Sequence, residues 1–159
     1  MVLEECHGCG WKVEGGAFRC RSRFETILAR DFSDVRYFRT HRLLVDTYCL
    51  QHPDEFCASA KSLAAHLVGL CWILELGAKP SIGPEKLHRW LDGDRHLEKT
   101  AIPRERGRLT IGDLPQEDDP VLWGKAVWRW AEETWSSYHT LHTVAREWLS
   151  QAQAIVTCA

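Results

Sequence analysis

Placed on a helix, residues 41 to 53 are apolar on nearly every side. At about 100° per residue, His41, Tyr48 and His52 fall on one stripe, and leucines cover the opposite side. A helix that is apolar all round is typical of a buried one. The polar groups of His41, Asp46 and His52 therefore need hydrogen-bond partners or a metal ion inside the fold, unless they lie at its ends.

Capping residues and prolines mark the ends of this helix and of its neighbour. Ser33 is placed to cap the first helix, and Pro53 ends it because the residue before a proline leaves helical geometry. Ser59 and Gly77 bound a second helix, so the two form an antiparallel hairpin. We expect further helices over residues 21–30, 84–91, 120–135 and 137–156, and a single turn at residues 110–113.

These elements predict a mainly α fold. The chain of 159 residues has the length of one domain, so we expect a single-domain helical bundle over residues 1–159. Its parts are an N-terminal cysteine-rich zinc knuckle at residues 1–20, the helical hairpin at residues 33–77 and C-terminal helices at residues 120–156. The irregular, polar stretch between residues 80 and 120 is either a lid or a linker.

Composition and charge narrow the class of protein. Eight tryptophans and 45% apolar residues exclude disorder, and a net charge of −2 offers no electrostatic basis for binding nucleic acid or an anionic membrane. We interpret the small basic clusters at Arg19–Arg23 and Arg104–Arg108 as solvated surface. The apolar run Leu63–Leu76 is shorter than the roughly 20 residues of a membrane span and is a core helix.

The N-terminal residues predict the compartment and the chemistry of the cysteines. Glu4 and Glu5 stand where a signal peptide would be basic, so we expect a cytoplasmic protein. The chain has seven cysteines, an odd number. In a reducing compartment they indicate free thiols or metal ligands rather than a disulfide framework.

A candidate zinc knuckle begins at Cys6. Cys6 and Cys9 have the two-residue spacing that lets both sulfurs reach one tetrahedral ion, and Cys20 is a third ligand. The alternatives are unligated cysteines or a redox pair, but a redox pair normally opens a helix beside a strand, a context that this sequence lacks. A complete site needs a fourth ligand, and His52, Cys57, His41 and Cys49 remain open.

A second polar cluster is expected further along the hairpin. Counting from the turn, His66 and Asp46 lie at similar depth, so a hydrogen bond between them is expected; such a pair orients an imidazole as a base or a ligand. The structural alternatives are a pair that only satisfies itself, or Asp46 paired with Arg42 one turn away. His41 and His52 are about 16 Å apart along the helix, so one ion cannot bind both. The second cluster therefore comprises His41, Asp46, His66 and His142.

Several short motifs along the chain occur together in one known family. They are Cys6-His-Gly-Cys9-Gly, Cys20, His41 with Val45-Asp46, Tyr48 with Gln51-His52-Pro53, Ser59 to His66-Leu67 with Gly69-Leu70, and His142 ahead of Val144, Arg146 and Trp148. On these residues the chain resembles the uncharacterised bacterial family catalogued as domain of unknown function 5946, and the likeness runs nearly end to end. The resemblance implies that the motif positions act together and brings no established reaction. It favours His52 as fourth ligand, because Cys49 and Cys57 are not motif positions.

Two functions remain at this stage. The first is a zinc-dependent enzyme that acts on a small molecule, with the second cluster as its catalytic residues. The second is a non-catalytic, zinc-stabilised module that binds a protein partner. A pocket beside His41 or His142 would favour the enzyme, and a dry core with an exposed apolar patch would favour the module. The absence of phosphate-binding, HExxH and GxSxG motifs leaves nucleotide chemistry and serine hydrolysis unsupported.

Overall fold

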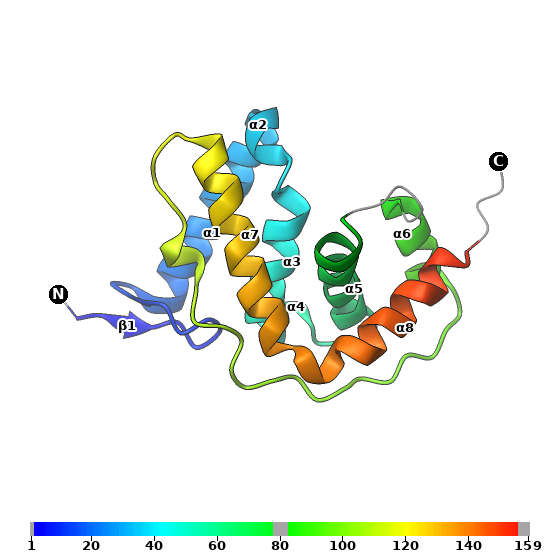
Figure 1. Cartoon of the computed structure of the whole chain (residues 1–159). Helices are drawn as coiled ribbons and strands as arrows, with labels where there is room; N and C mark the ends of the chain where they lie inside the picture. Colours follow the sequence, from blue (N-terminus) through cyan, green and yellow to red (C-terminus); the bar gives the residue numbers. More distant parts are fainter. Residues whose placement is uncertain (1, 78–82, 156–159) are drawn as a thin grey trace.

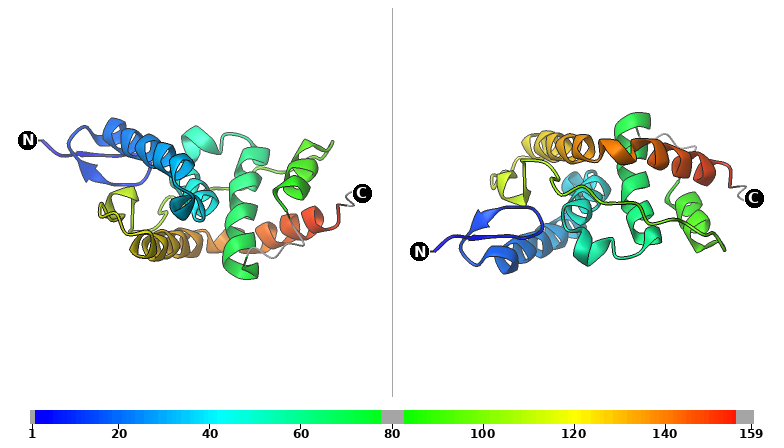
Figure 2. Two further views of the ribbon diagram at one scale, coloured as in Figure 1. Left: turned by 90° about the horizontal axis from the view of Figure 1, so that it is seen from above. Right: turned by 90° about the horizontal axis from the view of Figure 1, so that it is seen from below.

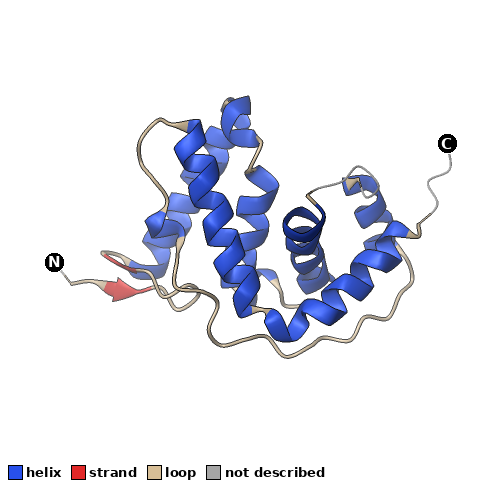
Figure 3. Ribbon diagram, viewed as in Figure 1, coloured by secondary structure: helices blue, strands red, loops and turns tan. Residues whose placement is uncertain are grey.

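Helices make up most of the computed structural model, which describes residues 2–77 and 83–155. The predicted mainly α fold is confirmed, and the two short strands lie at the N-terminus (Figure 3). The elements are β1 (Glu4–Glu5), β2 (Lys12–Val13), α1 (Gly16–Ser33), α2 (Val35–Phe38), α3 (His41–Gln51), α4 (Pro53–Phe56), α5 (Ala60–Leu76), α6 (Pro84–Asp92), η1 (Ile111–Asp113), α7 (Pro120–Ser137), η2 (His139–Leu141) and α8 (His142–Gln153).

Helix α3 lies at the centre of the fold. It packs against α5 on one side and α7 on the other, while α8 packs against α5 and α6 (Figure 1). Seen from above and below, α1 and the β1–β2 hairpin cover the end of the molecule opposite α6 (Figure 2). The residues of α3 are buried on both sides, as the sequence pattern predicted, and include Leu43, Leu44 and Leu50.

The second helix of the hairpin ends where the sequence predicted. The Ser59 side chain accepts a hydrogen bond from the Ser62 backbone N–H at 3.0 Å, and Gly77 ends α5 in the left-handed conformation. That conformation favours glycine because it has no Cβ. Within residues 2–77 and 83–155, no helix combines the length and the apolar character that crossing a membrane requires.

Helix α1 begins five residues earlier than predicted, at Gly16 instead of residue 21. The chain enters it through a turn in which Gly15 and Gly16 both have positive φ, at 85° and 47°. This turn connects β2 directly to α1, and the β1–β2 hairpin lies entirely before the turn. Cys20 therefore lies within a helix, whereas the sequence placed it in an irregular knuckle.

The predicted helix from Ser33 to Pro53 is two helices, and this expectation was wrong. Asp34, not Ser33, caps α2 by accepting a hydrogen bond from the Arg36 N–H at 2.9 Å. The chain then turns before α3, because the backbone N–H and the hydroxyl of Thr40 both donate to the Tyr37 carbonyl, at 3.1 and 3.2 Å. A hydroxyl that competes for backbone carbonyls in this way favours turns over helix interiors.

The C-terminal helices also differ in their limits from the prediction. Helix α7 runs two residues further than expected, and α8 begins at His142 instead of residue 137. The last expected residue, 156, lies outside the described residues. The intervening turn is fixed by buried Tyr138, whose hydroxyl donates to the Leu50 carbonyl at 2.5 Å.

The expected lid or linker crosses the molecule as an extended segment, residues 94–110, which we call the strap (Figure 1). Buried Gln51 holds it by donating to the carbonyls of Arg106 at 2.9 Å and Leu109 at 2.8 Å. Arg106 donates in turn to the Gly8 carbonyl at 2.9 Å. Arg106 and Arg23 are half-buried, so the basic clusters are not simply solvated surface as the sequence suggested.

Two glycines inside helices predict opposite effects of the same substitution. A Cβ on Gly69 would lie 1.9 Å from Oδ2 of Asp46, so Gly69→Ala should lower the free energy of unfolding by about 1–3 kcal/mol. The matched control is Gly124→Ala, where the nearest atom is Thr40 Cγ2 at 3.9 Å. It should raise that free energy by about 0.5–1 kcal/mol, because alanine is the better helix former. Urea unfolding measures both, and equal stability of the two variants would contradict the close contact of α3 with α5.

Candidate metal centre

Four side chains from three parts of the fold meet at one point. Cys6 and Cys9 lie in the turn between β1 and β2, Cys20 lies on α1, and His52 is the first residue after α3. Their three sulfurs and one imidazole nitrogen all lie within 4.8 Å of one another. Such a Cys3His group could bind a metal ion.

Three of the six distances within the group are 3.5–3.7 Å, and the others are at most 4.8 Å. The Nε2 atom of His52 is 3.5 Å from the sulfur of Cys6 and 3.5 Å from that of Cys20. The sulfurs of Cys9 and Cys20 are 3.7 Å apart. Cys6, Cys20 and His52 are buried and Cys9 is half-buried, so little solvent reaches the centre.

Two backbone hydrogen bonds and two glycines shape the turn between β1 and β2. The Cys6 N–H donates to the Trp11 carbonyl at 2.8 Å, and the Gly10 N–H donates back to the Cys6 carbonyl at 2.7 Å. Gly10 has a φ of 80°, which glycine adopts without strain. Gly8 lies against His52, since a Cβ there would be only 2.1 Å from the imidazole Cδ2. The turn therefore folds around the histidine as well as around the sulfurs.

The imidazole of His52 is held in one orientation. Its Nδ1–H donates to the Tyr48 carbonyl at 2.8 Å, which leaves the lone pair on Nε2 facing the sulfurs. The Tyr48 ring stacks on the imidazole with centroids 4.0 Å apart, and Phe24 stacks on the other face of Tyr48 at 3.8 Å. In this tautomer Nε2 is the nitrogen that can bind a metal ion.

The electrostatics of the centre favour a thiolate at Cys9 and a thiol at Cys20. A hydrogen bond from the Cys20 thiol, with a smaller contribution from His52, lowers the pKa of Cys9 to about 4. The same contact with Cys9, together with burial, raises the pKa of Cys20 well above its usual range. Three sulfurs in one buried group cannot all ionise without a cation, and thiolates are the form that binds metals.

Of the four candidates for the last ligand, the structure brings only His52 to the three cysteines. The thiol of Cys57 instead donates to the Cys49 carbonyl at 3.6 Å. Burial raises the pKa of Cys57 to about 12, as expected of a thiol in an apolar core. His41 contacts Asp31 at 3.2 Å through its Nδ1 atom.

The expected hydrogen bond between Asp46 and His66 is present. The Nδ1–H of His66 donates to Oδ1 of Asp46 at 2.9 Å, and the Arg42 Nε–H donates to Oδ2 at 2.6 Å. The sequence offered these two partners as alternatives, and the buried carboxylate has both. Gly69 gives it room, because any larger residue there would overlap the carboxylate.

The other two members of the predicted second cluster have other partners. His41 pairs with Asp31, and His142 donates from Nε2 to the Trp135 carbonyl at 2.8 Å while its ring stacks on that of Trp135. Within the described residues, no second group of three or more metal-ligating side chains comes together. A catalytic role for these four residues stays a prediction.

Sequence reasoning missed the residues that surround the centre. Arg106 reaches the Gly8 carbonyl from 98 positions away, and no local pattern signals such a contact. Gly8 itself carried a signal, because a glycine between two metal-binding cysteines indicates that something packs closely there. Tyr48 lay on the predicted stripe with His52, and its backbone carbonyl is what orients the imidazole.

Fold and site together define a small helical protein with a Cys3His group that could bind a metal ion. The chain belongs to the family of unknown function DUF5946, which matches residues 4–139. This confirms the resemblance drawn from the motifs, although His142 and the motif after it lie beyond the matched residues. Comparisons with curated proteins and with solved structures found no match.

The contact between Gly8 and His52 predicts a variant that keeps every ligand yet weakens the site. In Gly8→Ala the new Cβ would displace the imidazole, so metal affinity should fall at least tenfold. Titration with divalent cobalt, followed by its thiolate absorption, measures the affinity. His7→Ala is the control, because His7 is exposed beside the same turn. Equal affinities of the two variants would mean that His52 is not a ligand.

Proposed function

We propose that the chain is a zinc-stabilised helical module in which Cys6, Cys9, Cys20 and His52 hold one structural zinc ion. The distances carry this proposal. Bond lengths of about 2.3 Å to sulfur and 2.0–2.1 Å to nitrogen in a tetrahedron imply about 3.8 Å between sulfurs and about 3.6 Å between sulfur and nitrogen. One sulfur pair, Cys9 and Cys20, is 3.7 Å apart here, and two sulfur–nitrogen pairs are 3.5 Å apart, while the remaining pairs lie within 4.8 Å.

The number of ligands supports a structural role for the ion. Four protein ligands complete the tetrahedron, whereas a catalytic zinc keeps one position for water or substrate. The ion would join the β1–β2 turn to α1 and to the residue that follows α3. Zinc bound in this way contributes directly to the free energy of folding.

Surface features favour the module over the enzyme. Five of the best-formed clefts among the described residues are lined without any contribution from His41, Asp46, His66 or His142. Apolar side chains are exposed where α1 meets α2, including Phe32 and Val35, which are 71% and 73% exposed. Exposed patches of this kind are typical of surfaces that bind other molecules. No disulfide joins the six described cysteines, and thiols or metal ligands of this kind are what a reducing compartment such as the cytoplasm favours.

One observation favours the enzyme as a second candidate. The hydrogen bond from His66 to buried Asp46 is the arrangement by which a carboxylate orients a general base. His66 is half-buried, with 20% of its side chain exposed, so its other nitrogen is near the surface. On this reading Asp46 would act through His66, and His66 alone would meet a substrate.

The zinc proposal predicts about one tightly held zinc ion per chain, measured by elemental analysis of the purified protein. Removing the ion with a chelator should lower the melting temperature markedly, because the buried thiols would lose the cation that balances them. Cys20→Ser should lose the ion as well. A metal-free preparation with unchanged melting temperature would refute the structural role.

The identity of the fourth ligand predicts different behaviour for two neighbouring variants. His52→Ala should lose zinc as a cysteine variant does, since it removes one of the four bonds. Cys57→Ala is the matched control, because Cys57 is equally buried but bonds a carbonyl instead. It should lose stability yet keep its zinc. The opposite result would make Cys57 the ligand.

Asp46→Asn separates the two candidate functions. The variant keeps the shape of the side chain but removes the charge between Arg42 and His66. If the pair supports the core, the protein should melt at a lower temperature with its zinc affinity unaltered. Removing one member of such a pair entirely typically costs about 3–5 kcal/mol, so Asp46→Ala and His66→Ala should each destabilise, and less than additively when combined. An unchanged melt with weakened metal or ligand binding at the cluster of His41, Asp46, His66 and His142 would restore the enzyme reading.

A further inference from the structure

A basic cleft of about 480 Å³ lies beside the N-terminal hairpin. One face of α1 forms its floor, and Trp11 from the hairpin and Trp123 from α7 contribute to its walls. The Trp11 indole packs directly on Gly112, where a Cβ would lie 2.2 Å from its Nε1 atom. The cleft therefore has aromatic walls around a floor that carries charge.

Three arginines, Arg19, Arg23 and Arg30, line this cleft, and no acidic side chain does. Arg23 is anchored by donating to the carbonyls of Ile111 at 2.8 Å and Leu114 at 2.6 Å. Burial, and then the positive charges of Arg30 and Arg19, lower the pKa of Arg23. The cleft thus concentrates positive charge that an anion would balance.

Arg30 is fixed before any ligand arrives. Its guanidinium carbon lies 3.7 Å from the centroid of the Tyr37 ring and 3.8 Å from that of Trp123, and these two rings are inclined at 75° to each other. Both rings attract the positive charge and hold the group in place. Its Nη2 atom lies 3.4 Å from Oδ1 of Asp31.

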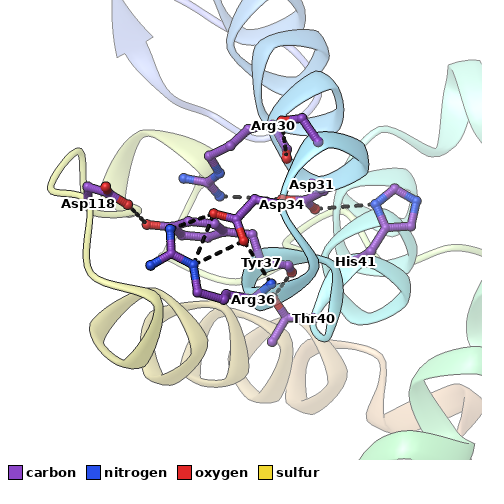
Figure 4. A network of polar contacts seen from close by, with 9 residues as sticks. Arg30, Asp31, Asp34, Arg36, Tyr37, Thr40, His41 and Asp118 are labelled. Carbon is purple, nitrogen blue, oxygen red and sulfur yellow. Dashed lines mark hydrogen bonds and ion pairs between the residues drawn. The ribbon is translucent and has the colours of Figure 1, made fainter.

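Asp31 and Tyr37, which contact Arg30, are themselves held in place, as Figure 4 shows. Asp31 is buried and contacts Nδ1 of His41 at 3.2 Å, so it cannot turn away from Arg30. The Tyr37 hydroxyl donates to Asp118 at 2.5 Å, which fixes the ring beneath the guanidinium. A binding group held this firmly loses little entropy when a ligand arrives.

Two buried donors at this cleft lack partners. The Nε–H of Arg30 and the Nε1–H of Trp123 are both buried without a hydrogen bond, and Trp123 is only 1% exposed. Leaving a buried donor unsatisfied costs roughly 1–3 kcal/mol. The two residues contact each other and line the same cleft, so one acceptor group could serve both.

We propose that this cleft binds a small oxyanion, a carboxylate or a phosphate, carried on a flat apolar body. The oxyanion accepts hydrogen bonds from Arg30 and Trp123 within the field of Arg19 and Arg23, and planar guanidinium groups suit such oxygens. The apolar body lies against Trp11 and Ile27, which line the same cleft. This inference concerns a separate site and does not rest on the zinc proposal.

Four probe compounds test both halves of the proposal on the full-length protein with its metal bound. Phenyl phosphate and benzoate carry the oxyanion on a ring, benzamide is the neutral match to benzoate, and inorganic phosphate lacks the ring. NMR of the tryptophan indole N–H groups reports binding, with the Trp123 signal assigned by its loss in Trp123→Phe. At least one of the two ring oxyanions should shift that signal and bind tenfold or more tightly than benzamide and inorganic phosphate. The tighter of the two identifies a phosphate ester or a carboxylic acid as the ligand type.

Variants of the arginines give the second test. Arg30→Gln should weaken binding of the better probe at least tenfold, and Arg19→Gln, an exposed residue that leaves the fold intact, should weaken it about threefold. Arg21→Gln is the control, since Arg21 lies on the same helix but pairs with Glu25 and Glu55. The proposal would be overturned if Arg19→Gln and a folded Arg30→Gln both bound the better probe with unchanged affinity. It would also be overturned by benzamide binding as tightly as benzoate, or by no shift of the Trp123 signal with any probe.

Discussion

The N-terminal third of this structure depends on the two nitrogens of one imidazole. The Nδ1 atom of His52 bonds the carbonyl of Tyr48, one turn back on the same helix, and so fixes the ring to α3. The Nε2 atom then faces sulfurs that come from the hairpin turn and from α1. The backbone at Gly8 closes over the ring. Position, tautomer and shape of this side chain thus decide where the first 20 residues can lie.

The neighbouring residue, Gln51, organises the opposite part of the chain. Its amide is buried, donates to two carbonyls of the strap and accepts from the indole of Trp130 at 3.1 Å. The C-terminal end of α3 therefore holds the β1–β2 hairpin through His52 and the strap through Gln51. Buried polar groups that are fully bonded specify one arrangement more strictly than apolar contacts do.

The sequence predicted the features that depend on local signals. The second helix of the helical hairpin, its two caps and the contact between Asp46 and His66 followed from Ser59, Gly77 and a count of residues from the turn. The break before α3 did not follow, because the apolar pattern continues through it and only the hydroxyl of Thr40 marks the turn. The basic cleft could not be predicted from the sequence, because its arginines are held by contacts with distant residues. Arg23 bonds a carbonyl 88 residues away, and Arg30 stacks on Trp123. In the sequence these arginines resemble any charged helix surface.

The ligands of the candidate metal centre are unevenly spaced along the chain. The three cysteines lie within the first 20 residues, and His52 follows Cys20 by 32 positions. A ribosome adds about 5–20 residues per second, so the thiol of Cys20 waits roughly 2–6 s for the histidine, and that of Cys6, 46 positions ahead of it, roughly 2–9 s. Until the histidine has been added, the cysteines cannot form the four-residue group. The order of the residues thus makes the candidate metal centre the product of two separate stages of synthesis.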